Sequence, residues 1–168
     1  HRIVHLVTRT QGLFLARGNP KRVASLQDLV RDDIVFVNRQ PRSGTRLLLD
    51  QLLAAGNLSP GGIRGYETEE FTHAAVAAYV ASGMADVGFG VQPAANQFKL
   101  EFIPVAQEEY LFALEASALD RPEIRELLDM LGGERFRAMV AELPGYDAPQ
   151  AGQVATVPEA FRRAAPKT

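Results

Sequence analysis

The segment at residues 38–46 joins an apolar, strand-like run to a helical run through a short polar loop. A strand, a loop and a helix start are therefore predicted in one place. The first amide groups of a helix have no intrahelical partner and carry partial positive charge, so this end of a helix can hold an anion. The hydroxyl, glycine and guanidinium groups available for this are those of Ser43, Thr45, Gly44, Arg42 and Arg46.

The same residues have a simpler structural use. Serine and threonine commonly cap the first turn of a helix, and either Ser43 or Thr45 would do this for a helix that begins near Arg46. On local sequence alone, capping and ligand binding both remain open.

Two further junctions between a strand and a helix are predicted. The first junction begins at Tyr66; here Thr72 is placed to cap a helix, and His73 lies in the first turn of that helix. The second junction follows the predicted strand at residues 86–90 and contains Gly90 and Val91. Ligands of open α/β sheets bind beyond the carboxyl ends of the strands, so all three junctions are candidate binding segments. A cap and a packed histidine remain the structural alternatives for Thr72 and His73. The nearby glutamates are expected to face solvent.

Strand-like and helical runs alternate along the chain, which predicts an α/β fold with a mixed, mostly parallel sheet and flanking helices. The predicted strands are residues 3–7, 13–16, 34–37, 63–66, 86–90, 102–105 and 110–114. The predicted helices are residues 25–29, 45–54, 69–82, 93–98, 122–131, 134–143 and 158–164.

Composition excludes several classes of function. The 168 residues are 46% hydrophobic, enough for a buried core, and the formal net charge of -2 provides no basic field for direct contact with nucleic acid. Cysteine is absent, which removes thiol chemistry and disulfides, and no apolar run is long enough to span a membrane. The chain begins at His1 without the pattern of a signal peptide, so we expect a cytoplasmic location, or a periplasmic one if an upstream signal was removed.

An ordered set of motifs gives the chain a family resemblance. The motifs are RTQGL at residues 9–13, GNP at 18–20, VNRQ at 37–40 followed by SGTR at 43–46, EFTH at 70–73, ASGMADVGFG at 81–90 and LPGYD at 143–147. Together they resemble the periplasmic-binding-protein-like domain of bacterial molybdate-related regulators and molybdopterin-biosynthesis-associated proteins. That family is similar to the tungstate- and molybdate-binding proteins of ABC transporters. The resemblance extends from about residue 4 to residue 154.

The resemblance implies a type II binding-protein fold, with a small ligand between two α/β lobes. Residues 1–24 would form hinge strands of a partial lobe 1, residues 25–106 a complete lobe 2, and residues 107–168 the return strand and helices of lobe 1 with a C-terminal tail. The usual N-terminal βα units of lobe 1 are missing, so lobe 1 is expected to be truncated there. Because a truncated lobe would expose apolar surface on residues 122–143, we expect self-association.

The resemblance also implies binding without catalysis. A molybdate or tungstate oxyanion would receive hydrogen bonds from the loop that precedes the first long helix and from the next helix start, and lobe closure would signal to an attached domain. No cofactor is implied. The implied ligand-binding residues are Ser43, Gly44, Thr45, Arg46, Thr72 and His73, with Arg42, Gln11, Arg9, Tyr66, Gly90 and Val91 as further candidates. A structural role at the hinge is favoured for Arg9 and Gln11.

Other functions fit fewer residues. Ser43, His73 and Asp86 are the residue types of a hydrolytic triad, but the Gly-x-Ser-x-Gly elbow is absent. His1, His5 and His73 lack the spacing of a metal site, so no metal is expected. Within the binding class, the alternatives are the solute-binding component of an anion ABC transporter and an effector domain for a small organic acid.

Overall fold

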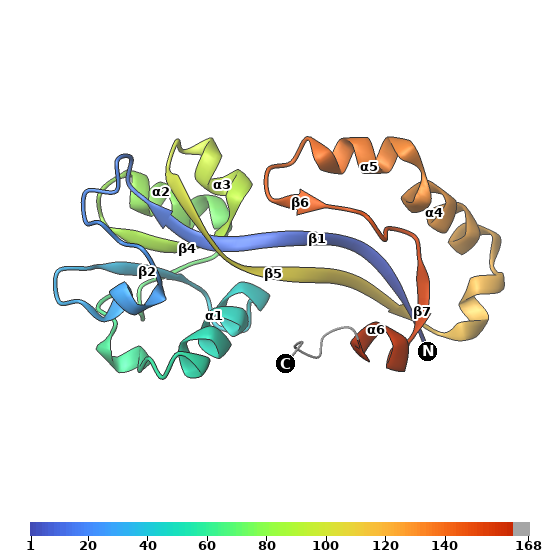
Figure 1. Ribbon diagram of the computed structural model, residues 1–168, viewed down its shortest axis with the longest axis horizontal. Coiled ribbons are helices and arrows are strands. Elements are labelled where there is room, and N and C mark those ends of the chain that lie inside the picture. The colour runs from blue at the N-terminus through green and yellow to red at the C-terminus, as the bar shows by residue number, and fades with distance from the viewer. Residues whose placement is uncertain (163–168) are drawn as a thin grey trace. The chain divides into compact units, whose positions relative to one another are not determined.

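The structure, a computed structural model, describes residues 1–162 and divides into two compact units. Unit 1 contains residues 1–9 and the chain from residue 107 onward, and unit 2 contains residues 10–106. Two long strands, β1 (Arg2–Leu15) and β5 (Glu101–Leu114), contribute to both units (Figure 1). Each of them replaces two shorter strands of the prediction, because the polar residues between the predicted strands continue the extended backbone.

Unit 2 is built on an open mixed sheet. Its strands β2 (Phe36–Arg39), β3 (Glu69–Glu70) and β4 (Val87–Val91) join β1 and β5 in the order β3-β2-β4-β1-β5. Strand β2 runs parallel to β3 and β4, whereas β4 is antiparallel to β1, with Gly90 opposite Gly12. The carboxyl ends of β2, β3 and β4 therefore lie at one edge of the sheet, as the junction argument requires.

Helices cover both faces of this sheet (Figure 1). Side chains alternate along β2, so Phe36 joins the core cluster that contains Leu49 and Leu53 of α1 (Gly44–Ala55), whereas Val37 joins the opposite cluster. That opposite cluster contains residues of α2 (His73–Ala81) and α3 (Gln92–Gln97). Two short 3-10 helices complete the unit, η1 (Leu26–Val30) and η2 (Pro60–Gly62). The predicted α/β class with flanking helices is confirmed.

Two predictions for residues 63–82 were wrong. Residues 63–66 do not form a strand, and Ile63 and Tyr66 instead pack into the core from a turn region. The predicted helix over residues 69–82 begins only at His73, because Glu69 and Glu70 pair with β2. The second error arises because the pairing of Glu69 and Glu70 with β2 is a tertiary contact that overrides local helix propensity.

Unit 1 adds two short strands to β1 that the sequence did not predict. Both β6 (Tyr146–Asp147) and β7 (Val154–Thr156) are antiparallel to β1. The helical elements are η3 (Ala116–Asp120), α4 (Pro122–Gly132), α5 (Glu134–Ala141) and α6 (Val157–Arg162). The last two residues of the helix predicted at 158–164 lie outside the described residues.

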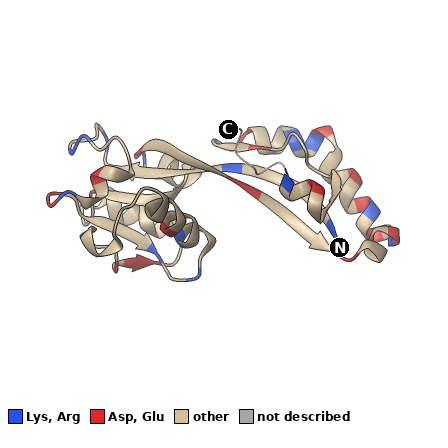
Figure 2. Cartoon of the chain, turned by 60° about the horizontal axis from the view of Figure 1, so that its bottom comes forward, with Lys and Arg blue, Asp and Glu red and all other residues tan. Residues whose placement is uncertain are grey.

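The surface of unit 1 combines apolar and charged side chains. Met130, Met139 and Leu143 on or beside α4 and α5 are about half exposed. Charges of both signs alternate along these helices, and neither sign forms a continuous stripe (Figure 2). Through residue 162, no helix combines the length and the apolar character needed to cross a membrane.

Candidate functional site

The first candidate segment forms the start of α1, directly after β2. Ser43 is the N-cap residue, and its Oγ accepts a hydrogen bond of 3.1 Å from the backbone N–H of Arg46. The capping role considered for Ser43 is therefore confirmed. Gly44 is exposed and Thr45 is only 3% exposed. The N–H groups of these two residues belong to the first turn, where the helix supplies no carbonyl partner.

Arg42 lies on the surface of the loop that leads into this helix. Its backbone has φ of 69°, a left-handed conformation that is uncommon outside glycine. The loop is closed by a hydrogen bond from the N–H of Ser43 to the carbonyl of Gln40. Arg42 is thus beside the helix start, with its side chain exposed to solvent.

The second segment forms the start of α2. Thr72 is the N-cap, and its Oγ1 accepts a hydrogen bond of 3.0 Å from the N–H of Ala75. His73 follows as the first helical residue, and its ring lies against the third segment: a Cβ added to Gly90 would be 2.6 Å from His73 Nδ1. The start of α2 is therefore packed against the end of β4.

The third segment is the end of β4, and its glycine serves the protein's own packing. The same added Cβ at Gly90 would be 2.7 Å from Cζ of Phe14, so the space beside Gly90 is filled by the side chains of His73 and Phe14. Val91 is 6% exposed and immediately precedes α3. The close approach expected at this glycine is thus made by protein side chains.

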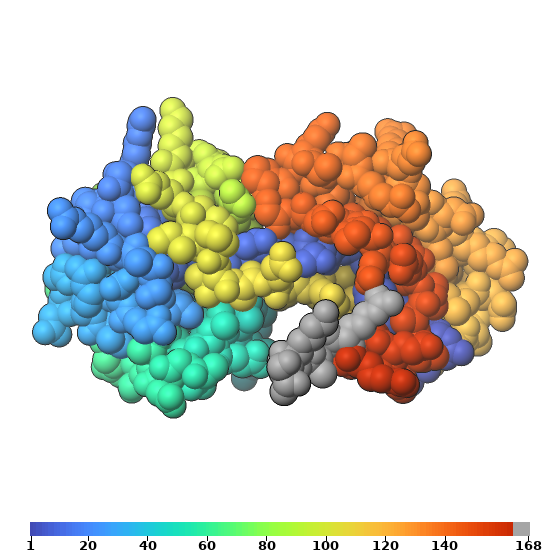
Figure 3. Space-filling view, viewed as in Figure 1, coloured from blue at the N-terminus to red at the C-terminus, as the bar shows by residue number. Residues whose placement is uncertain are grey.

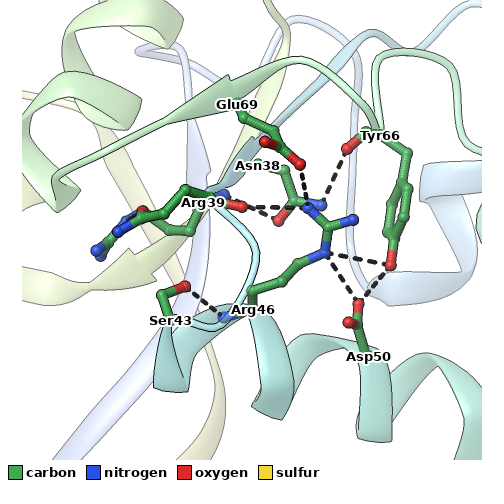
Figure 4. A network of polar contacts seen from close by, with 8 residues as sticks. Asn38, Arg39, Ser43, Arg46, Asp50, Tyr66 and Glu69 are labelled. Atoms are coloured by element: carbon green, nitrogen blue, oxygen red, sulfur yellow. Dashed lines mark hydrogen bonds and ion pairs between the residues drawn. The ribbon is translucent and has the colours of Figure 1, made fainter.

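Arg46 is bound by a network of polar side chains (Figure 4). The residue is 8% exposed, and its Nε donates to Oδ1 of Asp50 at 3.2 Å and to the hydroxyl of Tyr66 at 3.3 Å. Its Nη1 donates to Oε1 of Glu69 at 3.1 Å and to the carbonyl of Arg39 at 3.1 Å. The guanidinium also lies 4.1 Å from the centre of the Tyr66 ring. Much of its donor capacity is therefore used inside the protein.

The electrostatics of this network favour a charged Arg46 and a neutral Tyr66. Burial opposes the charge of Arg46, but the hydrogen bond to Tyr66 and the carboxylates of Asp50 and Glu69 outweigh it and raise the pKa of Arg46. Burial raises the pKa of Tyr66, and the hydrogen bond from its hydroxyl to Asp50 raises it further. The two carboxylates balance the arginine charge locally.

Sequence reasoning missed the other members of this network, which are Asn38, Arg39, Asp50 and Glu69. One of them carried a usable signal, since Asp50 lies four residues after Arg46 on a predicted helix, the spacing of a helical ion pair. Glu69 carried none, because its position beside Arg46 depends on the pairing of β3 with β2.

Arg9 and Gln11 both lie on β1, Arg9 in the part that belongs to unit 1 and Gln11 in the part that belongs to unit 2. Arg9 belongs to unit 1, where its Nε donates to Oε2 of Glu108 at 2.7 Å and its guanidinium lies 4.3 Å from the centre of the Tyr110 ring. Gln11 is fully buried opposite Val91 in the ladder between β1 and β4. These contacts agree with the structural role favoured for both residues.

Each unit has a hollow on its surface. In unit 1, a hollow of about 200 Å³ is lined by His5, Thr8, Tyr110 and Gln150 among others. In unit 2, another of about 200 Å³ is lined by residues 24–27 and 103–105, which belong to the blue and yellow regions of Figure 3.

The residue types of a hydrolytic triad are not assembled. Asp86 lies before the amino end of β4, where its Oδ2 accepts from the N–H of Val35 at 2.8 Å, whereas Ser43 and His73 follow the carboxyl ends of strands. Within residues 1–162, no group of three or more His, Asp or Glu side chains is arranged to hold a metal ion.

Comparison with known proteins identifies the family. Residues 1–132 match the PBP superfamily domain. The chain is 34% identical over 154 residues to the uncharacterized protein YvgK of Bacillus subtilis. The aligned region covers 90% of this chain and 49% of that protein. This chain therefore spans about half the length of that relative.

Solved structures share the fold at low sequence identity. The substrate-binding domain assigned to a molybdenum ABC transporter of Clostridium difficile has a TM-score of 0.60 and 22% identity, over 86% of this chain and 66% of that one. An ABC-type phosphate transport receptor of Vibrio cholerae has a TM-score of 0.58 and 15% identity, over 88% of this chain and 72% of that one. With its sheet topology and its sequence match in agreement, the chain belongs to the periplasmic-binding-protein-like (PBP) superfamily, whose fold is that of binding proteins.

Proposed function

We propose that this ligand-binding domain takes up a small tetrahedral oxyanion, molybdate or tungstate, at the starts of α1 and α2. The observation that carries the proposal is that two helices with hydroxyl N-caps, Ser43 and Thr72, begin at the same edge of one sheet. The first N–H groups and the partial positive charge of both helices are thereby available to one anion. The amides of Gly44, Thr45 and His73 would complete the donor set.

The cap hydroxyls are suited to donate outward. Each hydroxyl has one hydrogen and two acceptor lone pairs, and here Ser43 Oγ and Thr72 Oγ1 already accept from helix N–H groups. The hydrogen of each is therefore free to point at a ligand oxygen. Arg46 would hold the helix start in place without contacting the anion, because its guanidinium donates hydrogen bonds to Glu69, Asp50 and Tyr66.

Two observations lead us to propose molybdate and tungstate rather than other anions. The ordered motifs of the sequence resemble molybdate-related regulators, and one structure with this fold is assigned to a molybdenum transporter. Another is a phosphate transport receptor, so the fold accommodates other tetrahedral anions. Selectivity would then depend on cavity size and on the number of donors rather than on charge.

Isothermal titration calorimetry with molybdate, tungstate, sulfate and phosphate tests the proposal. We expect binding of molybdate or tungstate that is at least about tenfold tighter than that of sulfate, a difference of about 1.4 kcal/mol. If phosphate binds more tightly than molybdate and tungstate, the proposed ligand is wrong but the proposed site stands. Absence of heat with all four anions would refute the oxyanion function and direct attention to organic acids.

Removal of the cap hydroxyls should weaken binding more than folding. In the Ser43→Ala/Thr72→Ala variant we expect molybdate affinity to fall by about 100-fold, because two hydrogen bonds to a charged ligand are lost at roughly tenfold each. Loss of the two caps should cost about 1–2 kcal/mol of stability. Calorimetry and thermal unfolding measure the two effects separately.

Ser82→Ala is the matched control for these hydroxyls. Ser82 is at the other end of α2, where its Oγ donates to the carbonyl of Tyr79. This variant also removes a hydroxyl from α2 but should leave affinity unchanged. Equal affinities of the double variant and the wild type would exclude Ser43 and Thr72 from the site.

The output of binding is a second part of the proposal. We propose that the domain relays ligand binding to an attached regulatory or molybdenum-metabolism domain in the cytoplasm, and that unit 1 mediates self-association through its exposed apolar side chains. The alternative is a periplasmic solute-binding component of an ABC transporter. Size-exclusion chromatography and cell fractionation of the full-length protein discriminate between the two settings.

A further inference from the structure

The two proposed anion-binding helix starts lie on opposite faces of the sheet, and strand β2 lies between them. Helix α1 packs in the cluster that contains Phe36, and α2 packs in the cluster that contains Val37. Two helices that are separated by a sheet cannot fix each other's position directly. Some element at the edge of the sheet has to set the geometry of both sets of N–H groups.

On the α1 side, this element is Arg46. The acceptors of its guanidinium belong to four different segments: Asp50 on α1 itself, Tyr66 in the turn before β3, Glu69 on β3, and the carbonyl of Arg39 at the end of β2. Since α1 is thereby bonded to both strands that end beside it, the first turn of α1 cannot shift along the sheet edge without breaking these bonds (Figure 4).

On the α2 side, the element is the side chain of Arg39. Its Nη2 donates to the carbonyl of Phe71 at 3.1 Å, and Phe71 immediately precedes the cap residue Thr72. Its Nε donates to Oε1 of Gln40, and the N–H of Gln40 donates to the carbonyl of Glu70. The backbone of Arg39 thus bonds to α1 through Arg46, while its side chain bonds to the start of α2.

We propose that Arg39 and Arg46 are positioning residues that couple the starts of α1 and α2, and so set oxyanion affinity without touching the anion. This inference rests on the proposed oxyanion site. An anion binds most tightly when its hydrogen-bond donors are already held in the bound geometry. If a helix start is mobile, ordering it on binding costs free energy and lowers the affinity. Arg39 is the residue to test, because its side chain is only partly buried and its carbonyl remains for Arg46 after substitution.

Three variants separate positioning from charge. Arg39→Ala removes the bond to Phe71, Arg39→Lys keeps the charge and one donor, and Arg64→Ala removes an arginine from the same unit. Arg64 is exposed, and its side chain makes no hydrogen bond or ion pair with any described residue. In titrations with molybdate and tungstate, Arg39→Ala should lose about tenfold in affinity, Arg39→Lys should recover part of this loss, and Arg64→Ala should match the wild type.

Hydrogen exchange of the unliganded protein tests the coupling without any ligand. In Arg39→Ala we expect faster exchange at the hydrogen-bonded amides of Ser43, Arg46 and Ala75. Protection of residues 13–15 in the core strand should be unchanged, and the melting temperature should stay within a few degrees of wild type. Unchanged exchange at both helix starts, or equal loss of affinity in Arg39→Ala and Arg64→Ala, would overturn the inference. Failure of wild-type protein to bind any of the oxyanions, together with faster exchange in the variant, would refute the proposed function and leave the coupling standing.

Discussion

Gly65→Ala is expected to destabilise unit 2 strongly, with a loss of at least about 3 kcal/mol in the free energy of unfolding. The backbone of Gly65 has φ of 86°, and an added Cβ would lie 2.1 Å from the carbonyl oxygen of Phe36. That oxygen belongs to β2, so the clash can be relieved only by moving backbone. Urea unfolding followed by circular dichroism measures the loss.

Gly83→Ala is the matched control for backbone strain. Gly83 has φ of 78°, and its added Cβ would meet nothing within 4 Å. This variant should therefore lose only the cost of a left-handed backbone in a residue with a side chain, about 1–2 kcal/mol. If the two variants lose the same amount, the contact between Gly65 and β2 is not what decides the effect.

Gly65 also affects the candidate site. It immediately precedes Tyr66, whose ring and hydroxyl contact Arg46. The carbonyl of Gly65 accepts from the N–H of Thr68, which closes the turn toward β3. A shift of the backbone at Gly65 would therefore displace the aromatic support of Arg46 as well as the strand that carries Glu69. We expect any folded fraction of Gly65→Ala to bind oxyanion more weakly than Gly83→Ala.

Arg46→Met is expected to destabilise the protein by about 2–4 kcal/mol. Methionine fills similar volume without the charge. Glu69 therefore loses its hydrogen bond from the guanidinium, Asp50 keeps only the one from Tyr66, and both carboxylates lose their counter-charge. The cost is less than that of breaking a fully buried ion pair, because the side chains of Asp50 and Glu69 are 41% and 27% exposed. Thermal and urea unfolding measure the change.

Two controls show which property of Arg46 matters. Arg64→Met makes the same replacement at an exposed position of the same unit and should change stability by less than about 0.5 kcal/mol. Arg46→Lys keeps the charge but cannot reach acceptors on β2, β3 and α1 together, so it should lie between Arg46→Met and the wild type. A wild-type stability for Arg46→Met would mean that the network contributes nothing to folding.

Local chemistry explains which features could be predicted from the sequence. Capping was one of the two roles left open for Ser43 and Thr72, and it could be foreseen because an N-cap bonds to a backbone N–H only three residues away. The existence of α1, α4 and α5 followed from helical periodicity, and the α/β class followed from the alternation of runs. The order of motifs similarly indicated the superfamily.

Contacts between distant segments explain what could not be predicted. Residues 69–70 have a helical pattern, yet pairing with β2 makes them a strand and moves the start of α2 to His73. A ligand role was expected for the charge of Arg46, but the acceptors that use its guanidinium include Glu69, 23 residues away. Gly90 offered room for a ligand, but the fold fills that room with side chains from α2 and β1.

The candidate helix caps, the long helices and the binding-protein-like fold could be predicted, since these depend on residues within a few positions of one another or on the order of motifs. The partners of the buried polar side chains could not, because they come from segments that are far apart in the sequence. The reason is that a buried guanidinium has to be paired, and the partners of Arg46 are brought to it by the parallel pairing of β2 with β3. What remains at the sheet edge are the first N–H groups of α1 and α2 and the hydroxyls that cap them.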